Sequence, residues 1–369
     1  MREGWEYKKF ENCIVKSPKL KQVKKEAYNN GSQYPIISQE EKFISGYCDD
    51  ESMVCHIDRP VVVFGDHTRV LKYIDFDFVV GADGVKVIIP IKSIDSKFLL
   101  YFLQWYNIPN LGYSRHYKLL KDVMVPIPNC TTQLSIVSEL DKLNELIQIK
   151  KEQLKDYDAL AQSIFYEMFG DPVENEKGWE VKKLMEICDV RDGTHDSPKY
   201  VESSNYMLIT SKNIVNRAIS FDDVNYITEE DYNNINKRSK VDDGDIIMPM
   251  IGTIGNPVIV YLDNLHKFSI KNVALIKFFH NTSILNRYLL ELMISDSFRK
   301  YLLSLNKGGT QKFVALGTIR RMDIILPPLS LQQSFAHKIE QIERQKAAVQ
   351  STITDLETLL AARMQYWFD

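Results

Sequence analysis

The chain has 369 residues and a formal net charge of −3, and 44% of its residues are hydrophobic while 26% are charged. This length allows two buried cores with connecting helices, and the composition is that of an ordinary soluble protein. No run of about 18 apolar residues occurs and the opening MREGWEYKKF has no apolar signal segment, which argues against membrane insertion and secretion. The five cysteines form no Cys-x-x-Cys pair, so we expect a cytoplasmic protein in a reducing compartment.

Residues 1–130 are predicted to form a globular domain of mixed α/β structure. The domain opens on Gly4-Trp5-Glu6, and its runs of valine and isoleucine at 61–64 and 85–89 are bounded by Gly, Asp and Pro, as strands are. A short helix is expected from residue 96 to 104. Pro128 ends the last strand, and Thr131 is placed to cap the helix that follows.

Residues 131–170 are predicted to form a long helix that carries a coiled-coil seam. Its apolar residues recur at alternating spacings of four and three, which is the pattern of a helix that packs along one stripe. The seam residues of this first helix are Ile136, Leu140, Leu143, Ile147 and Leu154.

Residues 171–328 are predicted to form a second mixed α/β domain, and residues 329–369 a second long helix. The domain opens on Gly178-Trp179-Glu180, has a strand at 245–248 and a helix at 284–305, and ends at Pro327-Pro328 with Ser330 placed as the helix cap. The seam residues of the second helix are Ile339, Ile342, Val349, Ile353 and Leu356.

These segments are two copies of one plan. The Gly-Trp-Glu signatures are 174 residues apart, whereas the terminal prolines and the helices are 199 apart, so about 25 residues are extra inside the second domain. Neither long helix has another helix in sequence to cover its stripe, so each is expected to pack on the other. The predicted fold is therefore α+β, with two homologous mixed α/β domains separated by two long helices in an antiparallel coiled coil with pseudo-twofold symmetry.

Three cations occupy seam positions where an aliphatic residue is expected. They are Lys150, Lys346 and Arg363. Such residues either fix the register of the two helices or extend their charged ends out to solvent.

Basic residues cluster in loops of both globular halves, while the first helix region is acidic. The group 115–118 interleaves cations with an aromatic residue, and another group comprises Lys237, Arg238 and Lys240. Any one group is explained by a solvated face. Their recurrence in both halves favours nucleic-acid binding.

The sequence contains no set of residues typical of catalysis or metal binding. Nucleotide-binding glycine loops, a Walker loop and the Asn/Asp-Pro-Pro-Tyr/Phe tetrapeptide of amino-methyltransferases are absent. Residues 252–255 (GTIG) are interpreted as a tight turn. Glu180 and Lys182, with Asp171 upstream, are not assigned to a nuclease site, because 6–8 (EYK) occupies the equivalent place in the first half with no such aspartate before it. Cys48, Cys55 and His56 could supply three zinc ligands, but buried thiols are the simpler interpretation. We therefore predict no catalytic residues and no metal site.

Several segments resemble the specificity subunit of type I restriction-modification systems, over essentially the whole chain. In the second half these are 190–200 (VRDGTHDSPKY), 208–214 (LITSKNI), 244–247 (GDII), 252–255 (GTIG), 271–276 (KNVALI), 309–312 (GTQK), 325–328 (ILPP) and Gln332. In the first half, 64–69 (FGDHTR), 125–128 (VPIP) and Gln133 resemble the matching elements. The first half departs from the pattern, because it lacks the Asp-Gly-Thr-His segment and has LGYSR at 111–115.

The resemblance implies a sequence-specific subunit that binds double-stranded DNA and has no catalytic activity or cofactor of its own. Each domain would recognise one half of a split, asymmetric target, while the helices set the spacer and dock two copies of a methylation subunit. S-adenosylmethionine is then expected on the methylation subunits, and ATP and Mg²⁺ on restriction subunits that translocate and cleave DNA. No membrane partner is implied.

The side chains expected near DNA are polar or basic and lie in loops of both domains. They are His67, Thr68, Arg69, Arg115, His116 and Lys118 in the first domain, and Arg191, Thr194, His195, Ser197, Lys199, Ser211, Lys212 and Lys312 in the second. Lysine and arginine would hold phosphates while a few side chains reach base edges. Two alternatives remain open, namely a protein-only scaffold and a single-chain nuclease or methyltransferase with fused recognition domains.

Overall fold

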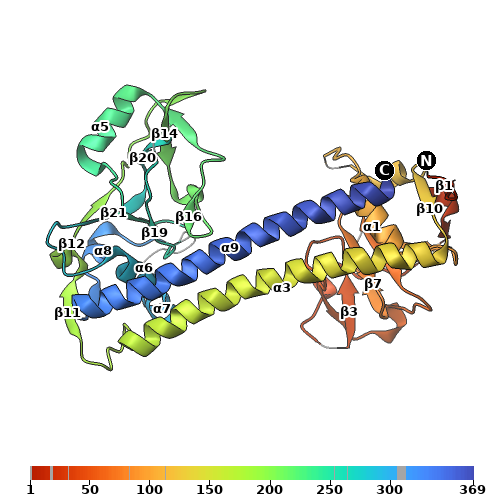
Figure 1. The fold of residues 1–369 in the computed structure, drawn as a ribbon, viewed down its shortest axis with the longest axis horizontal. Helices are drawn as coiled ribbons and strands as arrows, with labels where there is room; N and C mark the ends of the chain where they lie inside the picture. The colour runs from red at the N-terminus through yellow and green to blue at the C-terminus, as the bar shows by residue number, and fades with distance from the viewer. Residues whose placement is uncertain are drawn as a thin grey trace. The chain divides into compact units, whose positions relative to one another are not determined.

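The structure is a computed structural model that describes residues 2–16, 20–31, 33–82, 84–112, 114–252, 254–263, 265–305 and 313–369. The chain divides into two compact units (Figure 1). Unit 1 comprises Met1–Glu152 and Val349–Asp369, and unit 2 comprises Gln153–Ala348. Two 40-residue helices, α3 (Cys130–Phe169) and α9 (Leu329–Phe368), contribute a segment to each unit.

Unit 1 contains two four-stranded sheets, in the orders β2-β9-β6-β7 and β4-β3-β8-β5, and a two-stranded sheet β1-β10. The strands are β1 (Glu6–Lys9), β2 (Ile14–Val15), β3 (Tyr34–Ile37), β4 (Gly46–Cys48), β5 (Val54–Cys55), β6 (Val61–Gly65), β7 (Leu71–Ile74), β8 (Phe78–Val80), β9 (Val85–Pro90) and β10 (Met124–Ile127). The helices are α1 (Ser96–Tyr106), α2 (Tyr117–Leu120) and the 3-10 turns η1 (Phe10–Asn12), η2 (Lys25–Ala27) and η3 (Glu51–Met53). Strand β6 is buried along its whole length, as its unbroken valine run predicts for a strand covered on both faces.

Unit 2 has four-stranded sheets in the orders β12-β21-β18-β19 and β13-β17-β14-β20, and two-stranded sheets β11-β22 and β15-β16. The strands are β11 (Glu180–Lys183), β12 (Cys188–Asp192), β13 (Tyr200–Val201), β14 (Tyr206–Ile209), β15 (Ile214–Val215), β16 (Ala218–Ile219), β17 (Asn225–Ile227), β18 (Ile246–Pro249), β19 (Val258–Ile259), β20 (Lys267–Ile270), β21 (Val273–Phe278) and β22 (Asp323–Leu326). The helices are α4 (Leu184–Ile187), α5 (Glu229–Ser239), α6 (Asn286–Ile294), α7 (Asp296–Ser304), α8 (Leu316–Arg320) and the 3-10 turn η4 (Ser211–Asn213).

The two units share most of their strand topology, although among the described strands β5 has no counterpart in unit 2, and β13, β15 and β16 have none in unit 1. In each, the first strand pairs antiparallel with the last, with Glu6 opposite Ile127 and Glu180 opposite Leu326. The sheet β2-β9-β6-β7 corresponds to β12-β21-β18-β19, and the parallel pair β3·β8 corresponds to β14·β20. The duplication predicted from the Gly-Trp-Glu signatures is thus a repeated fold.

The segments of α3 and α9 pack antiparallel within each unit. In unit 1, Arg363 pairs with Glu139, and Lys151 Nζ lies 2.8 Å from Glu357 Oε1. In unit 2, Lys346 Nζ lies 2.9 Å from Asp158 Oδ1. Residue numbers rise along α3 as they fall along α9, which confirms the antiparallel pairing of the predicted fold class. The cations at seam positions 346 and 363 thus pair with carboxylates of the facing helix.

The seam residues lie between the helices and the cores of the units. Ile136, Leu140, Ile147, Ile339, Ile342, Val349 and Ile353 are buried, and Leu143, Leu154 and Leu356 are partly buried. Aromatic residues add to the packing of the helices. Phe368 of α9 packs edge-on against Phe98 in unit 1, and Phe335 of α9 packs edge-on against Phe165 of α3 in unit 2.

Three local expectations were wrong. Helix α3 begins at Cys130, and the Thr132 N–H donates to Asn129 Oδ1 at 2.9 Å, so Asn129 rather than Thr131 is the cap. Helix α9 begins at Leu329, which places Ser330 inside its first turn. The single helix expected at 284–305 is two helices, because Ser295 adopts an extended conformation between α6 and α7.

Among the described residues, no helix is both long enough and apolar enough to span a bilayer.

Candidate nucleic-acid interface

A loop at residues 193–199 of unit 2 follows strand β12 and is held against the start of β21. Gly193 lies so close to the neighbouring backbone that a Cβ there would sit 2.4 Å from the Ile270 carbonyl oxygen. Only glycine permits this approach. The next residue, Thr194, forms a parallel bridge to Lys271, and the Lys271 ammonium donates to Ser197 Oγ at 2.8 Å. The Asp-Gly-Thr-His segment thus has a defined conformation.

Asp192, at the end of β12, joins this loop to helix α5. Its side chain is 9% exposed and accepts from two partners, His195 Nε2 at 2.7 Å and the Arg238 guanidinium. The other ring nitrogen of His195 lies 3.0 Å from Asn272 Oδ1. One buried carboxylate therefore orients a loop histidine and a helix arginine together.

A recess of about 330 Å³ lies between this loop and α5. Its lining residues are Thr194, Asp196, Ser197, Pro198, Asp231, Asn234, Ile235, Arg238 and Ser239. Lys199 is exposed at the end of the loop, and its backbone N–H donates to Asp231 Oδ2 at 3.2 Å. The loop and the helix thus form one polar surface.

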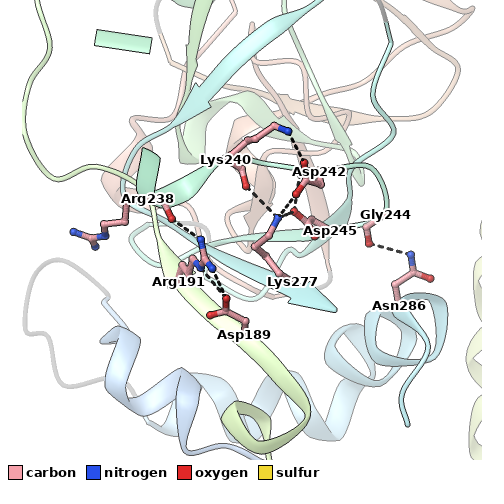
Figure 2. A network of polar contacts seen from close by, with 9 residues as sticks. All are labelled: Asp189, Arg191, Arg238, Lys240, Asp242, Gly244, Asp245, Lys277 and Asn286. Atoms are coloured by element: carbon pink, nitrogen blue, oxygen red, sulfur yellow. Dashed lines mark hydrogen bonds and ion pairs between the residues drawn. The ribbon is translucent and has the colours of Figure 1, made fainter. Parts of the chain in front are cut away.

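The carboxyl end of α5 is fixed by cations from neighbouring strands (Figure 2). Arg191 donates from Nη1 to the Arg238 carbonyl oxygen at 2.8 Å and from Nε to Asp189 Oδ2 at 2.8 Å. Lys277 donates to the Lys240 carbonyl oxygen at 3.1 Å. Cations that bind the last carbonyl groups of a helix stabilise its end. The predicted DNA contact Arg191 is therefore engaged by protein atoms.

Lys277 is the centre of the second half of this network. Its ammonium lies 2.9 Å from Asp242 Oδ2 and 2.5 Å from Asp245 Oδ2, and these hydrogen bonds outweigh burial and raise the pKa of Lys277. The hydrogen bond from Lys277 lowers the pKa of Asp242. Both groups remain charged at neutral pH, and they anchor the chain between α5 and β18 (Figure 2).

A second polar surface of unit 2 surrounds η4. Lys212 is exposed, with its ammonium 3.1 Å from Asp223 Oδ2, and Ser211 is partly buried beside it. Both residues line a recess of about 440 Å³ together with Gly252 and Asn256. The last predicted contact, Lys312, lies outside the described residues.

In unit 1, the predicted residues 67–69 form a tight turn after β6. Arg69 has a left-handed backbone (φ 65°), and its Nη1 donates to the Ile108 carbonyl oxygen at 2.8 Å. Thr68 Oγ1 donates to the Gln39 carbonyl oxygen at 2.6 Å, and the His67 N–H donates to Gln39 Oε1 at 3.2 Å. The side chains of Thr68 and Arg69 and the backbone N–H of His67 thus hold the turn against neighbouring loops.

The neighbouring segment 115–118 contains one buried residue between exposed cations. His116 is 0% exposed: its Nε2 accepts from the Leu111 N–H at 3.1 Å, and its Nδ1 lies 3.0 Å from the Asp66 carbonyl oxygen. Its imidazole therefore ties the 111–116 loop to the turn and does not reach the surface. Arg115 and Lys118 are exposed, and no hydrogen bond or ion pair joins their side chains to other described residues.

The sequence did not identify Asp192 or Asn272 as site residues, and of α5 it identified only the basic group that includes Lys237 and Arg238. Thr228 followed by three acidic residues was the available signal for α5, because its Oγ1 accepts from the Asp231 N–H as an N-cap. The contacts of Asp192 join segments that are far apart in the sequence, so no local sequence pattern predicts them.

Within the described ranges, no group of three or more His, Cys, Asp or Glu side chains is placed to hold a metal ion. Cys48 and Cys55 are buried free thiols, and His56 lies 2.6 Å from Asp77. The arrangement in both units presents hydrogen-bond donors and cations on fixed loops, which suits binding of a polyanion.

Comparison with known proteins identifies similar chains. A family model described as type I restriction modification DNA specificity domain matches residues 2–156 and 176–358. The type I restriction enzyme MjaIX specificity subunit of Methanocaldococcus jannaschii is 25% identical over 288 residues, which cover 70% of this chain and 64% of that protein. The MjaVIII specificity subunit of the same organism is 23% identical over 243 residues, covering 61% and 56%. The chain thus spans less than two thirds of either relative.

Two solved structures share the fold. One is the S subunit of a type I restriction-modification system from M. genitalium, with a TM-score of 0.54, 13% identity and coverage of 99% of this chain and 96% of that one. The other comes from a study of complex assembly and conformational transition of a type I R-M system, with a TM-score of 0.57, 15% identity and coverage of 100% and 98%.

Proposed function

Because the chain belongs to the type I restriction-modification DNA specificity family, we propose that it is the subunit that recognises the double-stranded DNA target of such a complex. Unit 1 reads one half of a split, asymmetric site and unit 2 reads the other. The observation that carries this proposal is that one strand topology recurs in both units with different exposed segments attached to it. A shared scaffold with two different polar surfaces suits two half-sites of different sequence.

The phosphate contacts are assigned to exposed cations at the loops described above. In unit 1 these are Arg115 and Lys118, and in unit 2 they are Lys199 and Lys212. Thr194, His195, Ser197 and Ser211 are placed nearby to contact phosphates or base edges. Thr68, Arg69, His116 and Arg191 instead position the loops, because their side chains bond backbone carbonyl groups of neighbouring segments, and His67 joins them through its backbone N–H. Lys312 stays a prediction.

The paired helices dock the catalytic partners and set the spacer between half-sites. Supporting this, α3 exposes large apolar residues away from its seam: Leu134 is 53% exposed, Leu146 45%, Ile149 54% and Leu160 46%. Leu146 and Ile149 are three residues apart and therefore share one face of the helix, where they offer an apolar contact to another protein. The proposed occupants are two methylation subunits, which carry S-adenosylmethionine. The restriction subunits of the complex carry ATP and Mg²⁺.

The test uses the chain assembled with its methylation subunits. The complex is titrated onto duplex DNA containing its methylation motif, at several salt concentrations, and the bound region is mapped by footprinting. Affinity should fall steeply with salt, and Lys212→Ala and Arg115→Ala should each weaken binding. Lys300→Ala, an exposed lysine on α7, serves as the control. If the complex assembles and does not bind DNA, the scaffold alternative is correct.

A further inference from the structure

Helix α5 occurs in unit 2 at a place where unit 1 has a different structure. Between the matching strands β4 and β6, unit 1 contains η3 and β5, and the fully described segment 49–60 has no α-helix. Between the corresponding strands β17 and β18, unit 2 contains α5. The flanking strands β17 and β18 match β4 and β6, and the other insertions of unit 2 lie before β17, namely β13, η4 and the β15-β16 pair.

The composition of α5 is not explained by packing of the core. Its sequence EEDYNNINKRS is polar, and Ser239 is its one fully buried residue. A helix that buries so little apolar surface gains little stability from burial. Hydrogen bonds to the rest of the unit hold α5 in place instead. Asn236 Oδ1 accepts from Ser269 Oγ at 3.0 Å. Arg191 and Lys277 donate to carbonyl groups at the carboxyl end of α5 (Figure 2).

One face of α5 is exposed along its length. Glu230, Asn233, Asn234 and Lys237 are all exposed, at spacings of three, four and seven residues. The side chain of Asn233 has no hydrogen-bond partner among the described residues, and Asn234 Oδ1 accepts from Lys237 Nζ at 2.9 Å. Asn234 also lines the recess that α5 shares with the 193–199 loop.

We propose that α5 is the specificity-determining element of unit 2, and that Asn233 and Asn234 contact base edges in the major groove. An α-helix fits this groove, and an asparagine amide pairs with the N6 and N7 atoms of adenine. Lys237, one turn further along, contacts a phosphate. Rigid anchoring is what a reading element requires, because a loosely held side chain cannot discriminate between bases. The inference rests on the proposed function and names the residues that carry it out in unit 2.

The test compares DNA selection by complexes containing the wild-type chain or the double variant Asn233→Ala/Asn234→Ala. Each complex is incubated with duplexes randomised across the methylation motif, and bound molecules are sequenced. The double variant should lose about 5- to 150-fold discrimination at one or two positions of one half-site, with the other half-site unchanged. Lys237→Ala should weaken binding of all sequences equally. The control is Asn281→Ala, an exposed asparagine in the turn after β21.

The possible results separate the two proposals. If the wild-type complex selects a bipartite sequence and the double variant keeps every preference, α5 is not the reading element while the proposed function stands. If the wild-type complex shows no sequence preference, the proposed function and this inference both fail. The double variant is expected to fold, because both residues are exposed and alanine has a higher helix propensity than asparagine. Asn233→Gln/Asn234→Gln, which retains the amides on longer side chains, should also alter the preference at the same positions.

Discussion

Gln133 and Gln332 make the same three hydrogen bonds in their respective units. Gln133 Oε1 accepts from the Asp95 N–H at 2.8 Å, while its Nε2 donates to the carbonyl oxygens of Ser93 and Pro128 at 2.8 and 2.9 Å. Gln332 Oε1 accepts from the Leu285 N–H at 2.8 Å, and its Nε2 donates to Ser283 and Pro327 at 2.9 Å each. Both glutamines are at most 1% exposed. Each joins the start of a long helix to the start of a shorter one.

Replacing either glutamine should destabilise its unit by a similar amount. Gln133→Ala and Gln332→Ala each leave a buried N–H and two carbonyl groups without their partner, so each should lower the free energy of unfolding by about 2–3 kcal/mol. Urea unfolding measures the loss. Gln148→Ala, on an exposed position of α3, should change stability little. A loss no larger than that of this control would show that the paired contacts are not structural.

The exposed cations of unit 1 should govern the salt dependence of DNA binding. The double variant Arg115→Ala/Lys118→Ala removes two proposed phosphate contacts, so the slope of log affinity against log salt should become shallower by about 2. Lys92→Ala is the matched control, because Lys92 is exposed and follows β9, outside the segments of unit 1 that are proposed to bind DNA. An unchanged slope in the double variant would move the binding face elsewhere.

Glu291 on α6 should destabilise the protein at neutral pH. It is 2% exposed, its Oε2 has no hydrogen-bond partner among the residues that the structure describes, and burial raises its pKa above the usual 4.5. The folded state therefore favours the protonated form, so the contribution of Glu291 to stability is greatest below pH 4.5 and falls as the pH rises through the folded pKa. Glu291→Gln should gain about 1–3 kcal/mol at pH 7.

That gain should shrink as the pH is lowered toward 4, which urea unfolding across the pH range would detect. Glu340→Gln, on an exposed position of α9, should show no such trend. If the Glu291→Gln variant is less stable than wild type at pH 7, the ionised carboxylate has a stabilising partner.

Glu139 should contribute to helix pairing with the opposite pH dependence. Hydrogen bonds from Arg363, and a further one from Trp367 Nε1 at 3.0 Å, lower the pKa of Glu139 below 4.5. Its contribution is therefore present above pH 4.5 and is lost as the pH falls through the folded pKa. The difference in thermal unfolding between wild type and Glu139→Gln should be small but measurable at pH 7 and should close at acid pH. A difference that persists at pH values where Glu139 is fully protonated would exclude the ion pair as its cause.

The repeated framework could be predicted from the sequence, because long-range repetition and helical periodicity are properties of the chain itself. The Gly-Trp-Glu signatures, the terminal prolines and the four-three spacing located the duplicated domains and the paired helices. Details that depend on neighbouring atoms could not be predicted. Asn129 rather than Thr131 caps α3, and Ser295 interrupts the helix expected at 284–305.

The candidate site was predicted less completely for the same reason. Loop position and residue type suggested that His116 and Arg191 bind DNA, but tertiary contacts determine where their side chains lie. Conversely, the polar sequence of α5 is typical of a solvent-exposed helix. Its proposed role in DNA recognition is inferred only from the comparison of matched strands in the two units.

The most direct measurement is the methylome of a strain that carries the complete system, with and without this chain. We expect adenine methylation at one bipartite, asymmetric motif with a spacer of constant length, and loss of that methylation when the chain is deleted. A contiguous motif, or methylation that persists without the chain, would contradict the claim that its two units read two half-sites.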